Sequence, residues 1–527
     1  MGTQGLKSKI ASGFLSLRGS PRDLYIIFVL KVLESYNYFS LSRLFVLYLT
    51  EDFGISDLTA GTLYGVWGML LTAYGFFLGG AIDFLGVKRS LVVCFALNIL
   101  SRLAMAMTST RWVLLVSLLG PNTVAGAMGV PVMTIGVKRY TNTLNRGFAF
   151  SLFYTLMNVA ALSQGVLMDF FRIRWKHGFD VPSLSGKSLL NNGNRLFLAS
   201  GCVTSLLGLG LTYLLSTAPV EVAEPGAAQR LPSSDSVVDQ EADPLVKGPP
   251  VGQEASKLGQ LWVAVRNVAL STEFVKYLFM CIITVNLKSV FRYLDAMLPK
   301  YQLRAFGCDA AIGLIYSINP LTIVFLVPVV GAMTTGFQHF DMIHMGSYLS
   351  ALSPLWLVLW QEEWAAALFV LTLSLGEAVW SPRWYDYSMA VAPTGREGVF
   401  TALASAPLFV AMLPTGMLSG YLLDRYCPDN GACGDVSKGK ASVKPETGEQ
   451  TCHGSAMWGL VTLLTLTHAY RLSFLPQKWV RPAPETGEAR DASSHPGECM
   501  DFNEADPLLL VENVSQTVVA PRRRGVE

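Results

Sequence analysis

Ionisable residues occur inside several long apolar stretches of this sequence, where a charge is costly and needs a partner or a role. Lys31, Glu34 and Tyr38 are three and four residues apart, so a helix would place them on one face. Glu377 lies in another apolar stretch, with no basic residue in the preceding turn. A charge at the centre of a bilayer costs about 2.5–3.5 kcal/mol on insertion scales. Both carboxylates are therefore candidates for binding protons or a solute, although Lys31 and Glu34 also fit a structural ion pair.

A third group of charges, Lys288, Arg292 and Asp295, has spacings of four and three residues. Arg292 and Asp295 come near the end of their apolar stretch, which favours a gate pair or a pair that reaches the membrane surface. Lys288 lies deeper and is a candidate cation of a solute site. Trp380 follows Glu377 closely, and either lines the same cavity or belongs to an interfacial belt of aromatic residues.

The apolar stretches define the fold class. Hydrophobic residues make up 51% of the 527 residues and charged residues only 15%, against about 25% charge in a soluble protein. Hydropathy predicts an all-α membrane protein with twelve transmembrane helices in two six-helix halves. The spans are expected at 23–50, 59–82, 88–109, 112–138, 146–170 and 195–216, then at 272–297, 310–334, 342–361, 364–392, 398–423 and 454–475. The corresponding parts are a tail at 1–22, a first half at 23–216, a linker at 217–271, a second half at 272–475 and a tail at 476–527.

The linker between the two halves is rich in proline, acidic and small residues, so we expect it to be disordered. Its last part, residues 257–270, places apolar side chains on one helix face, which predicts a short interfacial helix. Six spans, a loose linker and six more spans form the layout of transporters built from two parallel halves.

Basic residues in the short loops predict the orientation of the chain. The loops after the second and fourth spans contain Lys88, Arg89, Lys138, Arg139 and Arg146, whereas the loop after the first span is acidic. Lysine and arginine gather on the cytosolic side, so we expect both tails and the linker in the cytosol. One loop disagrees with this orientation, because Arg172, Arg174, Lys176, Lys187 and Arg195 would lie outside.

The loop after the second span reads GGAIDFLGVKRS and contains Gly79, Asp83, Gly86, Lys88 and Arg89. Glycines permit a tight turn between close-packed helices, and Asp83 can cap a helix N-terminus. The segment resembles the signature loop of the major facilitator superfamily. The resemblance implies the major facilitator fold, in which these residues serve gating and do not bind the solute.

Four helices resemble, more narrowly, the proton-dependent oligopeptide transporter family. The first span, KVLESYNYF, is similar to the acidic and aromatic first helix of that family through Glu34 and Tyr38. The fifth span, RGFAFSLFYTLMNVAA, has Asn158 at the family's asparagine, and the eighth, YSINPLTIVFLVP, has Asn319 before a proline. The tenth span, LGEAVWSP, has Glu377 ahead of a Ser-Pro pair. The expected site for solute and protons thus comprises Lys31, Glu34, Tyr38, Asn158, Lys288, Asn319, Glu377 and Trp380.

The chain departs from the family pattern in its first and fourth helices. The family's first helix carries an ExxER arrangement, but here Lys31 stands at the first glutamate and Ser35 at the arginine. The family's fourth helix has a lysine before a proline, whereas Val130 precedes Pro131 here. Two cations expected near the solute are therefore missing, and Lys288 is a candidate replacement for the lysine.

The residues and the resemblance together predict a secondary active transporter that moves a small polar organic solute, peptide- or amino-acid-like, with protons. Protonation would neutralise Glu34 or Glu377 and let the cavity close without burying a charge. Two alternatives stay open: a facilitator or exchanger of amino acids, organic anions or nitrate, and a membrane sensor that does not transport.

Enzyme motifs are absent from the sequence, which has no nucleotide-binding loop, nucleophile elbow or HExxH segment. We therefore expect no enzyme activity, no cofactor and no nucleic-acid partner. The expected partners are a small-molecule solute, protons and the lipid bilayer.

Cys427, Cys433 and Cys452 share one loop, and Cys308 lies in another loop that is expected on the same outer side. A disulfide is the commoner fate of cysteines outside the cytosol, so no metal site is expected. The expected pair is Cys427–Cys433, with Cys308 as a competitor.

The tail segment NEADPLLL at 503–510 repeats QEADPLV at 240–246 and resembles an acidic dileucine sorting signal. Such a signal would bring sorting adaptors to the tail and place the protein in a lysosome- or vacuole-like membrane of a eukaryote. If the segment is an ordinary solvated tail, the plasma membrane is the alternative.

Overall fold

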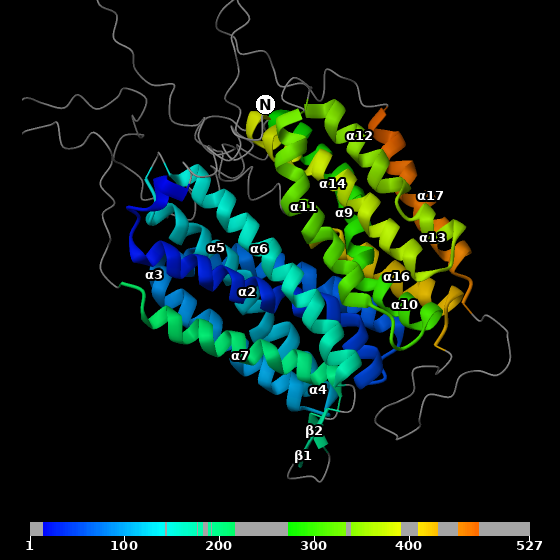
Figure 1. Ribbon diagram of the computed structural model, residues 1–527, viewed down its shortest axis with the longest axis horizontal. Helices are drawn as coiled ribbons and strands as arrows, with labels where there is room; N and C mark the ends of the chain where they lie inside the picture. The colour runs from blue at the N-terminus through cyan, green and yellow to red at the C-terminus, as the bar shows by residue number, and fades with distance from the viewer. Residues whose placement is uncertain are drawn as a thin grey trace, which may run out of the picture.

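The computed structural model describes residues 14–142, 145–175, 178–182, 188–190, 192–216, 272–333, 339–391, 409–429 and 452–473. These residues are almost entirely helical, and they form two groups of helices that lie side by side (Figure 1). The linker 217–271 with its expected interfacial helix, the tail 476–527 with its sorting segment, and most of the first tail lie outside the described residues. The limits of the five expected parts therefore stay predictions.

The first group of helices corresponds to the spans expected in the N-terminal half. It consists of α2 (Arg22–Leu47) with the π-helical turn η1 (Tyr48–Asp52), α3 (Asp57–Met107), α4 (Arg111–Ser117) with η2 (Leu118–Asn122) and α5 (Thr123–Arg139), α6 (Arg146–Asp169) with η3 (Phe170–Arg174), and α7 (Gly193–Tyr213). Two expected spans merge in α3, and the break between them falls at Gly86, whose φ of 74° favours glycine.

The second group corresponds to the spans expected in the C-terminal half. It consists of α9 (Thr272–Ala296), α10 (Leu298–Phe306), α11 (Ile312–Met333), α12 (His339–Leu352) with α13 (Leu355–Leu359), α14 (Glu363–Val391), α16 (Met412–Tyr426) and α17 (Gly454–Ser473). In the described part, eight helices are long and apolar enough to cross a membrane. The helical membrane fold is confirmed, whereas the count of twelve spans is only partly confirmed.

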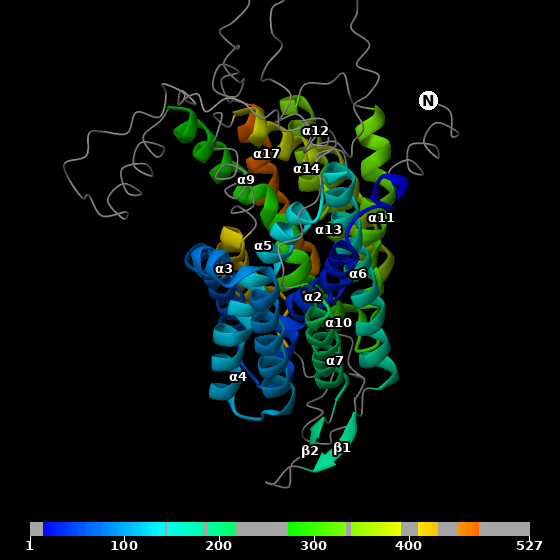
Figure 2. The ribbon, with the colours of Figure 1, turned by 90° about the vertical axis from the view of Figure 1, so that its left-hand side faces the viewer.

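Two short elements were not expected from the sequence. One is the helix α10, which follows α9 directly, and the other is an antiparallel hairpin of β1 (Phe179–Pro182) and β2 (Ser188–Leu190). Both are too short to produce a hydropathy signal. The hairpin projects from one end of the helical bundle, which we call the hairpin end (Figure 2).

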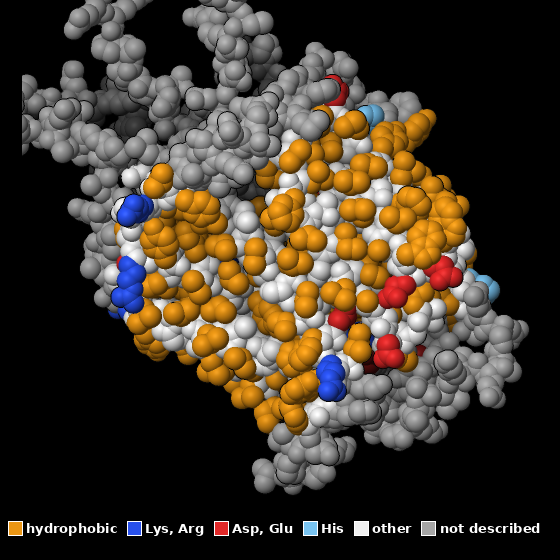
Figure 3. Space-filling model, in the orientation of Figure 1, with side chains coloured by type: hydrophobic (Ala, Val, Ile, Leu, Met, Phe, Trp, Pro, Cys, Tyr) orange, Lys and Arg blue, Asp and Glu red, His pale blue; other side chains and the backbone are white. Residues whose placement is uncertain are grey.

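The outer surface is suited to a bilayer. Figure 3 shows a broad hydrophobic face, with Lys and Arg side chains at its left-hand edge and one more group at the lower right, where most of the Asp and Glu side chains lie. Large apolar side chains are exposed along the helices, among them Phe77, Trp112, Leu207 and Phe325. In water such a surface would favour aggregation, whereas lipid tails solvate it.

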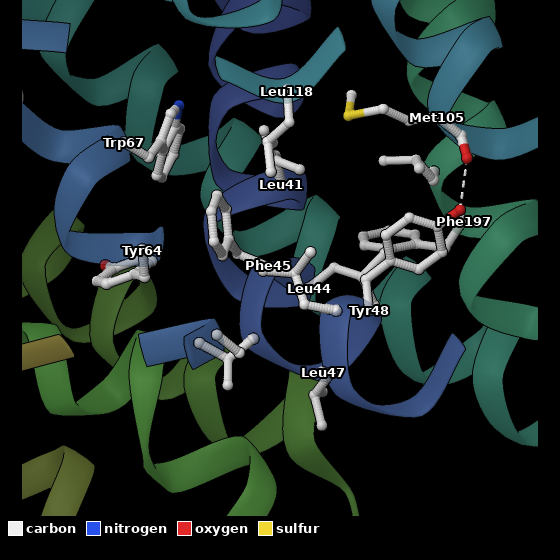
Figure 4. Packing of buried hydrophobic residues seen from close by; sticks show 14 of the residues in the cluster. Leu41, Leu44, Phe45, Leu47, Tyr48, Tyr64, Trp67, Met105, Leu118 and Phe197 are labelled. Atoms are coloured by element: carbon white, nitrogen blue, oxygen red, sulfur yellow. Dashed lines mark hydrogen bonds between the residues drawn. The ribbon is translucent and has the colours of Figure 1, made fainter. Parts of the chain in front are cut away.

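Aromatic and aliphatic side chains fill the interior of the N-terminal half (Figure 4). Trp67 stacks on Phe45 with ring centroids 5.2 Å apart and on Tyr38 at 5.8 Å. Tyr48 donates a hydrogen bond to the Met105 backbone oxygen at 2.5 Å. This packing fixes α2 against α3, and α2 carries Lys31, Glu34 and Tyr38.

The two halves meet closely where glycines face one another. A Cβ on Gly61 of α3 would overlap the carbonyl oxygen of Gly416 in α16, and a Cβ on Gly313 of α11 would overlap that of Gly165 in α6. Gly61 and Gly313 lie near the starts of their helices and Gly165 near an end, so these crossings belong to the hairpin end. Glycine lets the helix backbones approach and close the halves there.

One residue of the basic loop that disagrees with the predicted orientation, Arg195, is paired with an acidic residue. Arg195 forms a buried ion pair with Asp52 at 3.0 Å, and Arg172 hydrogen-bonds Asn194. Asn194 in turn donates to Glu51 at 2.9 Å. Arg195 is therefore compensated locally, whereas Arg172 has a neutral partner, and the disagreement between this loop and the predicted orientation remains.

The expected pairing Cys427–Cys433 is wrong. Cys427 forms its disulfide with Cys452, across 25 residues of sequence. Cys427 ends α16 and Cys452 lies just before α17, so the bond joins the ends of two packed helices. Cys308 is also disulfide-bonded, and Cys433 lies outside the described residues.

Candidate functional site

Lys31 and Glu34 form a direct ion pair inside the N-terminal half. The Lys31 ammonium lies 3.3 Å from the Glu34 carboxylate, and the two residues are 1% and 3% exposed. Lys31 also lies over the Phe153 ring of α6, 4.9 Å from its centroid. Glu34 packs against Gly129 of α5, where a side chain would crowd the carboxylate. The two side chains thus compensate each other in this conformation.

Glu377 has partners from two other helices, which the sequence did not reveal. Asn319 of α11 donates a hydrogen bond to its carboxylate at 2.8 Å and another to Ser374 at 3.0 Å. Lys288 of α9 interacts with Glu377 electrostatically and lies over the Trp380 ring, 4.2 Å from its centroid. Four expected site residues therefore lie together: Lys288, Asn319, Glu377 and Trp380.

The expected pair Arg292–Asp295 exists, at 2.9 Å, but it is buried inside the protein and does not reach the membrane surface. Asp295 also forms an ion pair with Arg43 of α2 and accepts hydrogen bonds from Tyr64 at 2.7 Å and Ser42 at 2.9 Å. We call these five residues the Asp295 cluster. The cluster connects the two halves, because Ser42, Arg43 and Tyr64 belong to one and Arg292 and Asp295 to the other.

Tyr38 connects the expected site to the Asp295 cluster. Its ring stacks on Trp67, and its hydroxyl accepts a hydrogen bond from Arg292. Arg43 lies over the ring of Tyr316, 3.1 Å from its centroid, and Tyr316 in turn interacts electrostatically with Glu377. Arg43 and Tyr316 thus link the Asp295 cluster to Glu377.

The side chains of Asn158 and Trp380 donate hydrogen bonds to other groups of the protein. The Asn158 amide donates to the Tyr154 backbone oxygen of its own helix. The Trp380 indole donates to Ser350 at 3.2 Å, and the residue is 1% exposed. Their part in solute binding stays a prediction.

The loop expected to serve gating is only partly described. Lys88 donates to the backbone oxygens of Tyr213 at 3.0 Å and Leu215 at 2.6 Å, at the C-terminal end of α7. A cation there complements the negative end of the helix dipole. Arg89 is exposed, and Gly86 breaks the helix. The surroundings of Gly79 and Asp83 lie outside what the structure describes.

Two further contacts across the halves could not be found from the sequence. Asp57, the first residue of α3, pairs with Arg304 of α10 at 2.6 Å and approaches Lys300 at 4.0 Å. Burial lowers the pKa of the Lys300 ammonium. Asp169 of α6 accepts hydrogen bonds from the backbone N–H groups of Gly313 and Leu314, both at 2.8 Å, and so caps α11. Asp169 directly precedes η3 and Asp57 is the first residue of α3. Their positions in the sequence do not predict which residues they contact.

No group of three His, Cys, Asp or Glu side chains suited to a metal ion occurs in the described part of the chain. The buried charges instead pair with one another and with amides across helices. Two helical halves that enclose paired charges and carry an apolar outer surface are typical of a membrane transporter.

The family follows from comparison with known proteins. Residues 27–413 match the profile of the Major Facilitator Superfamily, and the chain belongs to this superfamily. The superfamily consists of transporters and not of enzymes. No curated protein matches the sequence.

Solved structures of similar fold include peptide transporters, in agreement with the sequence resemblance. One is a POT family transporter in complex with 5-aminolevulinic acid, with a TM-score of 0.60, 14% identity, and coverage of 86% of this chain and 98% of that one. A bacterial homologue of the human drug peptide transporters PepT1 and PepT2 has a TM-score of 0.58 and 14% identity, with coverage of 86% and 96%. The nucleoside transporter NupG has a TM-score of 0.58 and 11% identity, with coverage of 86% and 99%. Identities this low establish the fold alone.

Proposed function

We propose that this transporter is a proton-coupled symporter of a small polar organic solute, peptide- or amino-acid-like. The observation that carries the proposal is the placement of Glu377 inside α14, with Asn319 and Lys288 as its partners from α11 and α9. A carboxylate in an apolar span exchanges a proton more readily than it bears an uncompensated charge. Glu377 is therefore the carboxylate that we assign to proton exchange.

The proposed cycle uses the two ends of the bundle in turn. The Asp295 cluster, the Asp169 cap and the glycine crossings close the hairpin end in the present conformation. Opening that end requires these contacts to break, and closing it re-forms them. Protonation of Glu377 frees Lys288 to pair with the acidic group of the solute, so the loaded site is enclosed without an uncompensated charge.

Support for the solute class comes from the chemistry of the site. Lys288, Glu377 and Asn319 present a cation, a carboxylate and an amide within one region. Such a set suits a solute that carries both an amino and an acidic group. One similar structure binds 5-aminolevulinic acid, a small molecule of this kind.

Uptake into proteoliposomes tests the proposal. Purified protein is reconstituted and offered a panel of peptides, amino acids, organic anions and nitrate, with and without an imposed pH gradient. We expect concentrative uptake of a peptide- or amino-acid-like solute that depends on the gradient. Uptake that does not depend on the pH gradient would favour the facilitator or exchanger. Binding of a solute without uptake would favour the membrane sensor.

We further propose that sorting adaptors read the tail segment 503–510 and direct the protein to an endomembrane of a eukaryotic cell. The acidic residues ahead of the leucine run in NEADPLLL support this proposal. Replacing Leu508 and Leu509 by alanine should then move the protein to the cell surface in fluorescence microscopy. An unchanged distribution would contradict adaptor binding.

A further inference from the structure

A small polar cavity lies inside the N-terminal half, beside the Lys31–Glu34 pair. Its lining includes Glu34, Asn37 and Tyr38 from α2, Trp67 and Arg102 from α3, and Asn122 from η2. The cavity has room for about one water molecule. We call it the Arg102 cavity.

Four residues that line this cavity have buried polar atoms without a hydrogen-bond partner among the described residues. They are Nε and Nη1 of Arg102, Nε1 of Trp67, Oδ1 of Asn37 and Oδ1 of Asn122. The four residues are 1%, 1%, 2% and 5% exposed, so bulk water does not reach these atoms. Buried polar atoms are rarely left unpaired, and a group of them around one space indicates a bound molecule.

The chemistry of the lining selects water over an ion. Arg102 and Trp67 offer donors, whereas Asn37 and Asn122 offer acceptors. The Asn37 amide nitrogen already donates to Leu33 and Thr204, which leaves its oxygen as the free group. An anion would leave the asparagine oxygens unsatisfied, and a cation would face the guanidinium. Water both donates and accepts, and buried waters make two to four such bonds.

Arg102 also lacks a direct counter-ion. None of the ion pairs among the described residues involves it, and its hydrogen bond goes to the Asn37 backbone oxygen. Tyr36 and Cys202 interact with it electrostatically, but both side chains are ordinarily neutral near pH 7. Glu34 is the carboxylate that lines the same cavity, and Lys31 holds it directly.

We propose that an ordered water in the Arg102 cavity links Glu34 to Arg102, which makes Arg102 the second counter-cation of Glu34. In the transport cycle proposed above, on which this role rests, Lys31 can then leave Glu34 without leaving the carboxylate uncompensated. A buried charge that loses its only partner is strongly destabilising. Arg102 is thus a positioning residue that acts through Glu34.

A double-mutant cycle on the full chain tests the link by thermal unfolding in detergent. Glu34→Gln should lower the melting temperature less in the Arg102→Gln background than in the wild type, because the partner is already absent. Arg102→Lys should restore the larger effect, since it keeps the charge. Arg139→Gln, an exposed arginine at the end of α5, should leave the Glu34→Gln effect unchanged. If Glu34→Gln lowers the melting temperature equally in the wild type and in the Arg102→Gln background, the proposal is overturned.

A second measurement needs no variant and no transport, so its outcome is separate from that of the proposed function. A high-resolution experimental structure of the full chain should show density within hydrogen-bond distance of Arg102 and Trp67. An empty cavity would overturn the proposal. Anomalous signal from bromide at that position would also overturn it, because the ligand would then be an anion.

Discussion

The two glutamates inside the membrane spans have partners of different kinds. Glu34 forms a direct ion pair with Lys31, one helical turn away. Glu377 accepts a hydrogen bond from the neutral amide of Asn319, and its cation, Lys288, also rests on the Trp380 ring. Both lysines lie over a ring, but the Trp380 indole under Lys288, at 4.2 Å, is a better partner for a cation than the Phe153 ring under Lys31, at 4.9 Å. Neutralising Glu34 removes the direct counter-charge of Lys31.

This difference predicts unequal effects on stability. Glu34→Gln should destabilise the protein by roughly 3–5 kcal/mol, because it leaves a buried ammonium without its counter-ion. Glu377→Gln should cost less, since the new amide still accepts a hydrogen bond from Asn319. Thermal unfolding of the two purified variants in the same detergent shows which variant loses more stability. A larger loss from Glu377→Gln would contradict the assignment of roles.

The double variant Lys31→Met/Glu34→Gln serves as the control. It removes both charges and keeps similar volumes, so much of the stability lost in Glu34→Gln should return. If the double variant is no more stable than Glu34→Gln alone, the stranded charge is not the cause.

Sequence spacing identifies only those charge pairs that lie within one helix. Lys31–Glu34 and Arg292–Asp295 are three residues apart, and both pairs exist. Arg43–Asp295 and Asn319–Glu377 join different helices, at separations that periodicity cannot detect. For the same reason, spacing alone assigns no role to Arg102. Its significance depends on a cavity lined by residues of α2, α3, η2 and α5.

At the scale of elements, helix ends hold the two halves together. Asp169 ends α6 and caps the first turn of α11, so a carboxylate from one half satisfies N–H groups of the other. Such groups have no partner within their own helix. Asp57 opens α3 and pairs with Arg304 of α10 in the same way, across the halves. Opening the hairpin end must break both contacts.

Asp169→Asn should therefore favour an open hairpin end. Asparagine keeps one acceptor oxygen but places an NH2 group against the second N–H. The loss of one such hydrogen bond costs about 1 kcal/mol, which changes a two-state population about fivefold. Spin labels are placed at the exposed positions Thr110 and Glu362, one in each half. Opening of the hairpin end should lengthen the distance between the two labels. Asp309→Asn, an exposed acid in the loop before α11, is the matched control and should change nothing. Unaltered distances in Asp169→Asn would contradict a gating role for the cap.

Hydropathy locates the long elements well and misses the short ones. Each expected span overlaps a helix, because twenty apolar residues give a strong signal. The helix α10 and the hairpin are short and partly polar, so no window of hydropathy detects them. The glycines of the segment GGAIDFLGVKRS predicted a tight turn, and the break in α3 falls at Gly86, whose positive φ glycine readily adopts.

At the scale of the whole molecule, the orientation in the membrane is a prediction that the disulfide can test. The loop between α16 and α17 is expected outside, and Cys427–Cys452 closes it. After reduction, an impermeant thiol reagent should label Cys452 in intact cells that carry the protein at their surface, as the variant with Leu508 and Leu509 replaced by alanine is expected to do. The buried Cys94 and Cys281 should stay unlabelled. Labelling of Cys452 only after permeabilisation would reverse the orientation.

Glu377 is the residue that we propose to couple the solute to the proton. The most direct measurement compares wild type and Glu377→Gln in proteoliposomes, for the solute that the panel identifies. Each is assayed for accumulation driven by a pH gradient and for exchange of labelled against unlabelled solute without a gradient. We expect that Glu377→Gln retains exchange, because its amide preserves the shape of the site, but loses gradient-driven accumulation. Accumulation at the wild-type level by Glu377→Gln would contradict coupling through α14.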